Sequence, residues 1–385
     1  MHLVWATEKL VIAGRAKPGF PILLYESGQS CIPANEFMRY YLSRGAIASK
    51  KSWPSTGRAL YDYFSFLEAN ELDWRDVDRG EQRTLVAAYR DWNLDDIKLK
   101  TNTVSQRLVY ICKFYEYALK LGWVERLPYG YERRHLHRNH DFLAHTDASG
   151  GEIEVRDVMP RRHHGLPKFL SQSQLRILLS AVKNPHHKIL MRFALQTGLR
   201  REEIATFPIS YVFDPDKAGR KERNLRITLD PRDGSGIKTK GSKPRDIYIS
   251  RRLMKDLFHY VGVLRGERRR VDQPDVNELF VNQDGSPYSA DGKGIERIVR
   301  DIGRTVGIHT HPHMLRHTYA THTLVALQRN RGRNAIEPLV FLQRQLGHTS
   351  IKSTMIYLHL VNELADDAVL QYDDELNDLF DSEAA

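Results

Sequence analysis

The sequence predicts an α+β fold that is mostly helical: a small all-α domain followed by a larger mixed domain with one small antiparallel sheet. Three observations indicate this fold. Apolar residues recur at helical spacing between about residues 30 and 125. The period becomes strand-like only between Leu225 and Ser250, with helical patterns before and after that stretch. The length of 385 residues also exceeds the roughly 150 residues expected per domain.

Residues 1–29 contain short β-prone pieces broken by Gly and Pro, and we predict an N-terminal extension to which the sequence assigns no role. The all-α domain is predicted over residues 30–125. Its four expected helices are one from about Asn35, one capped by Ser55, one over about 81–92, and one from Thr103 to Gly122.

Residues 126–166 show no sustained periodicity and contain several Arg and His around Gly150-Gly151, which predicts a basic interdomain linker. An ordinary surface loop is the alternative. The second domain is predicted over residues 167–362 and opens with a capping box at Ser171 and Gln174. Strands are predicted there over 225–229, 237–240 and 246–249, and helices over about 186–197, 250–264, 289–305, 312–327 and 338–346.

The charge is unevenly distributed along the chain. A total of 58 Lys and Arg against 48 Asp and Glu gives a net charge of +10, yet nine acidic residues and no basic residue follow Lys352. Residues 1–352 therefore carry +19. Such a basic body suits a polyanion, because Lys and Arg that neutralise phosphates release condensed counterions. A basic protein that binds no nucleic acid is the alternative interpretation.

The two cysteines, Cys31 and Cys112, each lie in an apolar or aromatic neighbourhood and form no CxxC pair. This pattern predicts buried thiols in a reducing compartment, and not a zinc or redox site. The sequence has no apolar run of 18 residues and no signal-peptide pattern at its start. We therefore expect a cytoplasmic protein without a membrane partner.

Three separated stretches in the second domain carry residues suited to phosphodiester chemistry. They are Thr197–Glu203, with Arg200 and Glu203; His313–His317, with Arg316; and Leu346–His359, with His348 and Tyr357. Gly347 is predicted to end a helix in a left-handed conformation, so that His348 and Tyr357 can face one pocket. In this order, the three stretches resemble the signature of the tyrosine recombinase (phage integrase) family.

The residue types explain how DNA can be cut at such a site. Tyr357 suits a nucleophile, because a phenol with a pKa of ~10 is more acidic than an alcohol and forms a stable ester. Arg200 and Arg316 supply planar, permanently charged groups that match phosphate oxygens. Since these guanidiniums replace a metal ion, we expect neither metal nor cofactor. Tyr319 and Tyr372 are rival nucleophiles, but neither has the His-x8-Tyr spacing.

The resemblance implies roles for other residues. His313 would serve as acid or base on the nucleophile side, and His348 would bond a non-bridging phosphate oxygen. Lys240 matches the lysine that protonates the leaving 5′ hydroxyl, with Lys238 and Lys243 as competing candidates. We expect Glu203 to orient an arginine or a histidine of the site, with a helix-capping surface acid as the alternative.

The resemblance also implies a function. It identifies residues 30–125 as a core-binding domain that lies on DNA, with candidate contacts at Lys50, Lys51, Arg58, Lys113 and Lys120, any of which can instead be a solvated surface charge. The expected protein is a site-specific recombinase of the bacterial nucleoid that cuts and rejoins double-stranded DNA through a 3′-phosphotyrosyl intermediate. It would be a monomer or dimer when free and a homotetramer on synapsed DNA, with accessory DNA-bending or partner recombinase proteins. The alternatives are a type IB topoisomerase-like enzyme and a non-catalytic architectural protein.

Three features leave further hypotheses open. A zinc site is suggested by His309, His311, His313, His317 and His322, but Arg316 would place a permanent cation beside the metal. Residues 327–334 lengthen the connection between the second and third stretches and, with the linker, favour a mobile-element enzyme. The acidic tail, residues 363–385, has Leu370, Leu376, Leu379 and Phe380 at helical spacing. We expect it to dock on a neighbouring protomer, with a disordered tail as the alternative.

Overall fold

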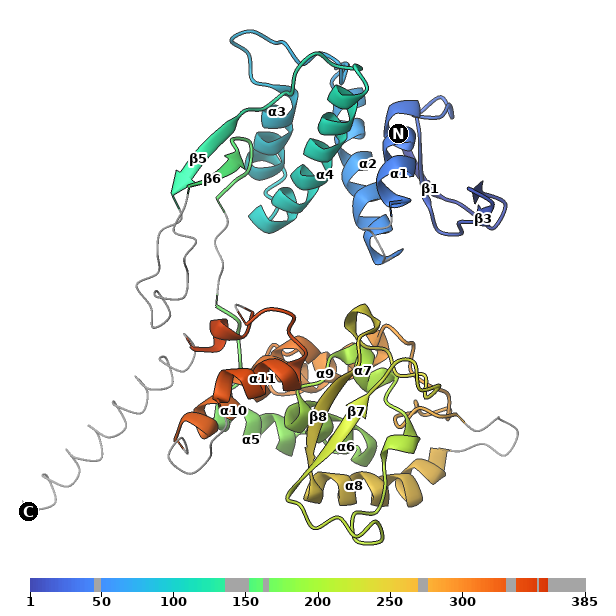
Figure 1. The fold of residues 1–385 in the computed structure, drawn as a ribbon, viewed down its shortest axis with the longest axis vertical. Coiled ribbons are helices and arrows are strands. Elements are labelled where there is room, and N and C mark those ends of the chain that lie inside the picture. The colour runs from blue at the N-terminus through green and yellow to red at the C-terminus, as the bar shows by residue number, and fades with distance from the viewer. Residues whose placement is uncertain are drawn as a thin grey trace, which may run out of the picture. The chain divides into compact units, whose positions relative to one another are not determined.

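The computed structural model describes residues 1–44, 50–135, 152–161, 166–268, 276–329, 337–351 and 353–358. The chain divides into two compact units, residues 1–164 and 165–385, each with its own hydrophobic core (Figure 1). The fold class is the predicted one, because the described residues form a mostly helical α+β structure whose sheets are all antiparallel pairs.

Four helices form the core of the first unit. They are α1 (Ile32–Leu42), α2 (Trp53–Ala69), α3 (Leu85–Asp91), which continues into the π-helical turn η2 (Trp92–Asp96), and α4 (Thr101–Lys120). Aromatic side chains fill the space between α2 and α4, where the hydroxyls of Tyr63 and Tyr115 share a buried hydrogen bond of 2.6 Å. The helix that we predicted to be capped by Ser55 begins earlier, because Pro54 suits the first helical turn.

The N-terminal residues, predicted as an extension, pack with the four helices in this first unit. β1 (His2–Trp5) pairs with β4 (Pro21–Leu24), and β2 (Val11–Ile12) pairs with β3 (Arg15–Ala16). Leu23 is buried among the helices, and its backbone N–H and C=O both bond to the Asn35 side chain of α1 at 2.8 Å. The alternately buried apolar residues of β4 therefore give the predicted extension a structural role.

A hairpin occupies part of the predicted linker. β5 (Tyr131–His135) pairs with β6 (Glu152–Arg156), and the residues that flank the hairpin, Tyr129 and Val158, are buried in the first core. The sequence shows no strand periodicity here. The hairpin is held instead by its flanking residues, which are buried in the helical core. Gly150-Gly151 lies outside the described residues.

Both cysteines are buried free thiols in the first unit, as predicted. Burial raises the pKa of Cys31, and it raises the pKa of Cys112 to about 12. These thiols therefore stay protonated and act as small apolar groups.

The second unit is organised around one antiparallel pair, β7 (Asn224–Leu229) with β8 (Arg245–Ser250). α6 (Pro185–Thr197), α8 (Arg251–Gly262) and α11 (Pro338–Leu346) all contact β8 (Figure 1). The remaining helices are α5 (Gln172–Ser180), which has the predicted capping box at Ser171, α7 (Arg201–Ala205), α9 (Lys293–Thr305) and α10 (Pro312–Arg329). No helix in the described ranges has the length and apolarity needed to cross a membrane.

The stretch 237–240 is not a strand, so this prediction was wrong. Ile237 is buried, but the chain turns at Gly241 and Ser242, which have φ angles of 73° and 51°. Residues Lys240–Ser242 form a short 3-10 turn, η4, which contains the left-handed Gly241 and precedes β8. The lysines of this stretch therefore lie on an exposed loop between β7 and β8.

Candidate active site

Two glycine caps bring the three predicted stretches together. α6 ends at Gly198 and α11 ends at Gly347, both with φ of 64°, as the left-handed cap predicted for Gly347 requires. Any larger residue would also clash, because a Cβ at Gly198 would lie 2.3 Å from the Tyr319 ring, and one at Gly347 would lie 2.6 Å from Cδ of Arg245. α10 packs on both α6 and α11 and so places its side chains between the two helix ends.

Arg316 of α10 lies between these helix ends. Its side chain is buried, with Nη1 donating to the Gly198 carbonyl at 2.7 Å and Nη2 donating to the Leu346 carbonyl at 2.5 Å. Both carbonyls belong to helix C-termini, where the aligned peptide dipoles concentrate partial negative charge. Burial, and then the charge of Arg200, lower the pKa of Arg316. Helix ends therefore fix this guanidinium, which forms no ion pair among the described residues.

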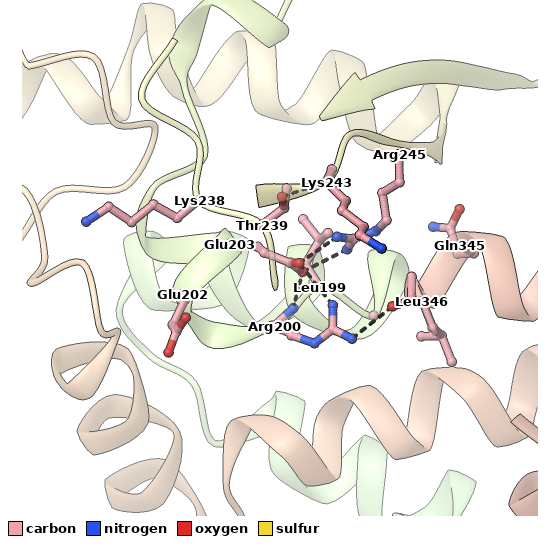
Figure 2. A network of polar contacts seen from close by, with 12 residues as sticks. Leu199, Arg200, Glu202, Glu203, Lys238, Thr239, Lys243, Arg245, Gln345 and Leu346 are labelled. Atoms are coloured by element: carbon pink, nitrogen blue, oxygen red, sulfur yellow. Dashed lines mark hydrogen bonds and ion pairs between the residues drawn. The ribbon is translucent and has the colours of Figure 1, made fainter. Parts of the chain in front are cut away.

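Glu203 joins two arginines beside this position (Figure 2). The Arg200 backbone N–H and Nη1 donate to its carboxylate at 2.8 and 3.1 Å, and both Nη atoms of Arg245 donate to it at 2.6 and 2.8 Å. Arg200 Nη2 also donates to the Gly347 carbonyl at 3.2 Å. Although burial raises it, the arginines hold the pKa of Glu203 below its usual value. Glu203 is thus a buried anchor and not a surface acid.

Tyr357 is only 2% exposed and lies on a short helical segment over residues 353–358. Its hydroxyl lies 2.9 Å from Nδ1 of His317. The ring of His348 is parallel to the Tyr357 ring at 6.3 Å between centroids, and its Nδ1 lies 3.0 Å from the hydroxyl of Thr354. Burial raises the pKa of Tyr357, whereas Arg316 and Arg200 act in the opposite direction. The phenol is therefore protonated at neutral pH.

The histidines around Tyr357 are neutral at neutral pH. Burial and the charges of His313 and Arg316 lower the pKa of His317 to about 3, and burial with Arg316 and Arg200 lowers that of His348 to about 3. Desolvation and Arg316 also lower the pKa of His313. His313 is exposed, and its ring lies 4.5 Å from that of His317. The positive charge of the site therefore comes from arginine and lysine.

Lys240 extends this positive charge from the β7–β8 loop. It is exposed in η4, and its ammonium is among the charges that lower the pKa values of His313 and His348. Thr239 Oγ1 donates to the Lys243 carbonyl at 2.8 Å, which closes the loop around Lys240. Lys238 points away from the Arg200 and Glu203 cluster (Figure 2). Of the three candidate lysines, Lys240 is the one whose charge is among the influences on the pKa values of His313 and His348.

Two histidines of the histidine-rich stretch form hydrogen bonds with the protein backbone. His311 Nδ1 accepts from the Met314 backbone N–H at 3.2 Å at the start of α10, and His322 Nε2 lies 2.9 Å from the Leu170 carbonyl. Across the residues that the structure describes, no group of three or more His, Cys, Asp or Glu side chains could hold a metal ion.

Several predicted DNA-contacting lysines lie over aromatic rings of the first unit. Lys113 Nζ donates to the Tyr41 hydroxyl at 2.8 Å and lies 4.8 Å from the centre of that ring. Lys120 lies 5.8 Å from the Tyr40 ring, and Lys50 lies 5.5 Å from the Trp53 ring. Cation–π contacts of this kind restrict the ammonium groups while leaving them near the surface.

Sequence reasoning missed Arg245, Gln345 and the contact made by His317. A signal existed for Arg245, because it shares the strand face of the buried Ile247 and Ile249, where an arginine needs a partner. Gln345 is also buried, and its amide accepts from the Tyr248 N–H at 2.7 Å and donates to the Thr197 carbonyl at 3.2 Å. These contacts join residues about 100 to 150 positions apart, which no local pattern encodes.

Comparisons with known proteins all point to one family. Residues 168–363 match the phage integrase family. The chain is 26% identical over 310 residues to the tyrosine recombinase XerC of Lacticaseibacillus casei (strain BL23), covering 78% of this chain and 85% of that protein. It is 28% identical over 241 residues to the tyrosine recombinase XerH of Campylobacter jejuni, covering 58% of this chain and 59% of that protein.

Two solved structures share the fold. The XerH site-specific recombinase bound to a palindromic difH substrate, a post-cleavage complex, superposes with a TM-score of 0.55 at 17% identity, covering 85% of this chain and 81% of that one. The Tn1549 transposon integrase in complex with a circular intermediate DNA also gives a TM-score of 0.55 at 17% identity, covering 84% and 94%. With a family match over more than half its length, the chain belongs to the phage integrase family of tyrosine recombinases.

Proposed function

We propose that this tyrosine recombinase cuts one strand of double-stranded DNA at a specific site with Tyr357. The phenolic oxygen attacks the scissile phosphorus, the bond to the 5′ oxygen breaks, and a 3′-phosphotyrosyl ester remains. The freed 5′ hydroxyl of a partner strand then attacks this ester and restores a phosphodiester. No external energy source is needed, because each new ester replaces a broken one. The buried Tyr357, whose pKa is raised by burial against the opposing charges of the fixed Arg316 and Arg200, carries this proposal.

Arg200 and Arg316 hold the phosphodiester in this scheme. Both guanidiniums are fixed by backbone carbonyls at the ends of α6 and α11, so they need little rearrangement when the phosphate gains charge during attack. His348 donates to a non-bridging oxygen, and Lys240 protonates the departing 5′ oxygen from its exposed loop. His313 assists on the nucleophile side, and Glu203 orients Arg200.

The biological unit is a homotetramer on two synapsed duplexes and a monomer or dimer when free. Accessory DNA-bending proteins or a partner recombinase complete it. The mobile-element role is supported by the lengthened connection over residues 327–334, part of which lies outside the described residues. The family match does not favour a topoisomerase-like enzyme or a non-catalytic architectural protein.

The test uses nicked suicide duplexes cut from the DNA that flanks the gene. We expect the wild type to form an SDS-resistant adduct and Tyr357→Phe to form none while binding DNA normally. Tyr372→Phe serves as the matched control and keeps the adduct. Strand cleavage by Tyr357→Phe would refute the assignment of the nucleophile.

A further inference from the structure

The hydrogen bond between His317 and Tyr357 is not explained by the roles proposed above. His317 directly follows Arg316 on α10, is half-buried, and holds its Nδ1 2.9 Å from the phenolic oxygen. A neutral imidazole with its proton on Nε2 presents Nδ1 as an acceptor. In that tautomer, the phenol of Tyr357 donates its proton to His317, which is the geometry that a general base requires.

We propose that His317 is the general base that removes the phenolic proton from Tyr357 as its oxygen attacks the scissile phosphorus. This inference rests on the proposed function. In the step, the Tyr357 oxygen bonds to phosphorus and its proton moves to Nδ1 of His317. The bond from phosphorus to the 5′ oxygen breaks, and that oxygen takes a proton from Lys240. His317 gains one proton and Lys240 loses one, so charge and protons balance.

Geometry favours His317 over His313 for this role. His317 is the histidine in hydrogen-bond contact with the phenol, whereas His313 is exposed and packs edge-on against the His317 ring. His313 lies one helical turn before His317, on the side of His311 and the start of α10. The two histidines therefore share the acid–base work on the nucleophile side that the family resemblance assigned to His313 alone.

The charges around His317 make its basicity depend on whether a DNA phosphate is bound. The charged and titratable groups that act on His317 are Arg316 and His313 of α10, His311 before it, and His348 after α11, with Tyr357 in contact. Together with burial they hold the pKa of His317 near 3, which makes the imidazole a weak base while the arginine charges are uncompensated. A phosphate on Arg316 and Arg200 adds negative charge and favours the imidazolium. A phosphodiester in the site therefore makes His317 a stronger base toward the phenol.

The experiment separates proton removal from positioning. His317→Asn can keep a hydrogen-bonding atom near the position of Nδ1 but cannot accept a proton. We expect single-turnover cleavage of a nicked duplex to fall by about 10²- to 10⁴-fold, with DNA affinity within a few fold of the wild type. His309→Asn, an exposed histidine outside the site, is the matched control.

Two rescue reactions identify which proton is lost. Replacing Tyr357 by a fluorinated tyrosine, whose phenol is more acidic, should restore most of the cleavage by His317→Asn and little of that by Lys240→Ala. A duplex with sulfur in place of the scissile 5′ oxygen should restore Lys240→Ala and not His317→Asn, because a thiolate leaves without a proton.

The possible outcomes are distinct. Cleavage by His317→Asn within threefold of the wild type would overturn the inference, and so would a large loss that fluorotyrosine fails to restore, since His317 would then only position the phenol. Absence of an adduct in the wild type would instead contradict the proposed function.

Discussion

The buried carboxylate of Glu203 pairs with Arg200 and Arg245 but not with the neighbouring Arg316. Arg316 donates its hydrogen bonds to carbonyls at helix ends, which supply partial charges and not a full compensating charge. The site therefore holds excess positive charge in a largely desolvated place. This arrangement is costly for the free protein and suits a phosphodiester that gains negative charge during attack.

The neutral histidines predict how stability depends on pH. The folded-state pKa values of His317 and His348 are about 3, whereas an unfolded histidine titrates near 6.5. Below about pH 6.5 the unfolded state therefore binds protons that the folded state excludes. The free energy of unfolding should fall as pH drops through this window, by up to about 1.4 kcal/mol per pH unit for each histidine.

Chemical unfolding of the second unit between about pH 7 and pH 5 measures this slope. His348→Asn should flatten it relative to the wild type, because one proton fewer is taken up on unfolding. His309→Asn, on the exposed side of the same histidine-rich stretch, is the control. An unchanged slope in His348→Asn would show that the buried imidazole is not responsible.

At the scale of elements, β8 connects the lysine loop to the arginines. Arg245, its first residue, holds Glu203 with two parallel hydrogen bonds and lies five positions after Lys240. We expect Arg245→Lys to lose the paired geometry and to slow cleavage by about tenfold or more, since an ammonium cannot form both bonds. Arg245→Gln should destabilise the unit by about 3–5 kcal/mol, because it removes one partner of a buried ion pair.

Single-turnover cleavage, DNA affinity and thermal unfolding separate these effects. The matched control is Arg226→Gln on β7, whose side chain is 64% exposed and forms a loose 3.8 Å pair with Asp246. A surface pair of this kind contributes about 0–1 kcal/mol. Equal destabilisation by the two glutamine variants would argue against a buried anchor at Arg245.

The cap of α11 gives a second test at this scale. In Gly347→Ala, the left-handed backbone costs roughly 1–2 kcal/mol, and the new Cβ also meets Arg245 at 2.6 Å. Gly219→Ala measures the cost of the left-handed backbone alone, because Gly219 has nearly the same φ, 65°, and open space around it. We expect Gly347→Ala to lower the melting temperature more than Gly219→Ala. Equal effects would mean that Arg245 moves aside without cost.

The sequence predicted the elements whose signals are local. Helical periodicity, the capping box at Ser171 and the glycine cap at Gly347 all correspond to observed features. Partners distant in sequence could not be predicted. The stretch 237–240 has strand composition, but the left-handed turn after it prevents pairing, and the N-terminal strands are ordered by helices that follow them in the chain. The same limit hid Arg245, whose carboxylate partner lies 42 residues away.

At the scale of the whole molecule, charge separates a basic body from an acidic tail. Residues 363–385 carry nine acidic residues and no basic ones, and they lie outside the described residues. If the tail docks on a neighbouring protomer as proposed, a chain that ends at residue 362 should bind one duplex but fail to form the synaptic tetramer. Sedimentation of the DNA complexes measures this directly.

A matched control replaces the tail leucines Leu370, Leu376 and Leu379 by serine and leaves the acidic residues in place. Loss of the tetramer in both variants supports apolar docking. Normal assembly and recombination by the truncated chain would contradict the docking hypothesis. Stronger binding to unrelated DNA by the truncated chain alone would indicate that the tail only limits non-specific contacts.

The position of Arg316 between two helix ends couples the stability of the fold to substrate binding. An anion bound at Arg316 would supply the negative charge that Arg316 lacks among the described residues. Such an anion would bind the folded chain but not the unfolded one. By mass action, every bound phosphodiester therefore adds to the free energy of unfolding. We therefore expect the recombinase to resist heat and proteolysis less when free than when a phosphodiester is bound at Arg316.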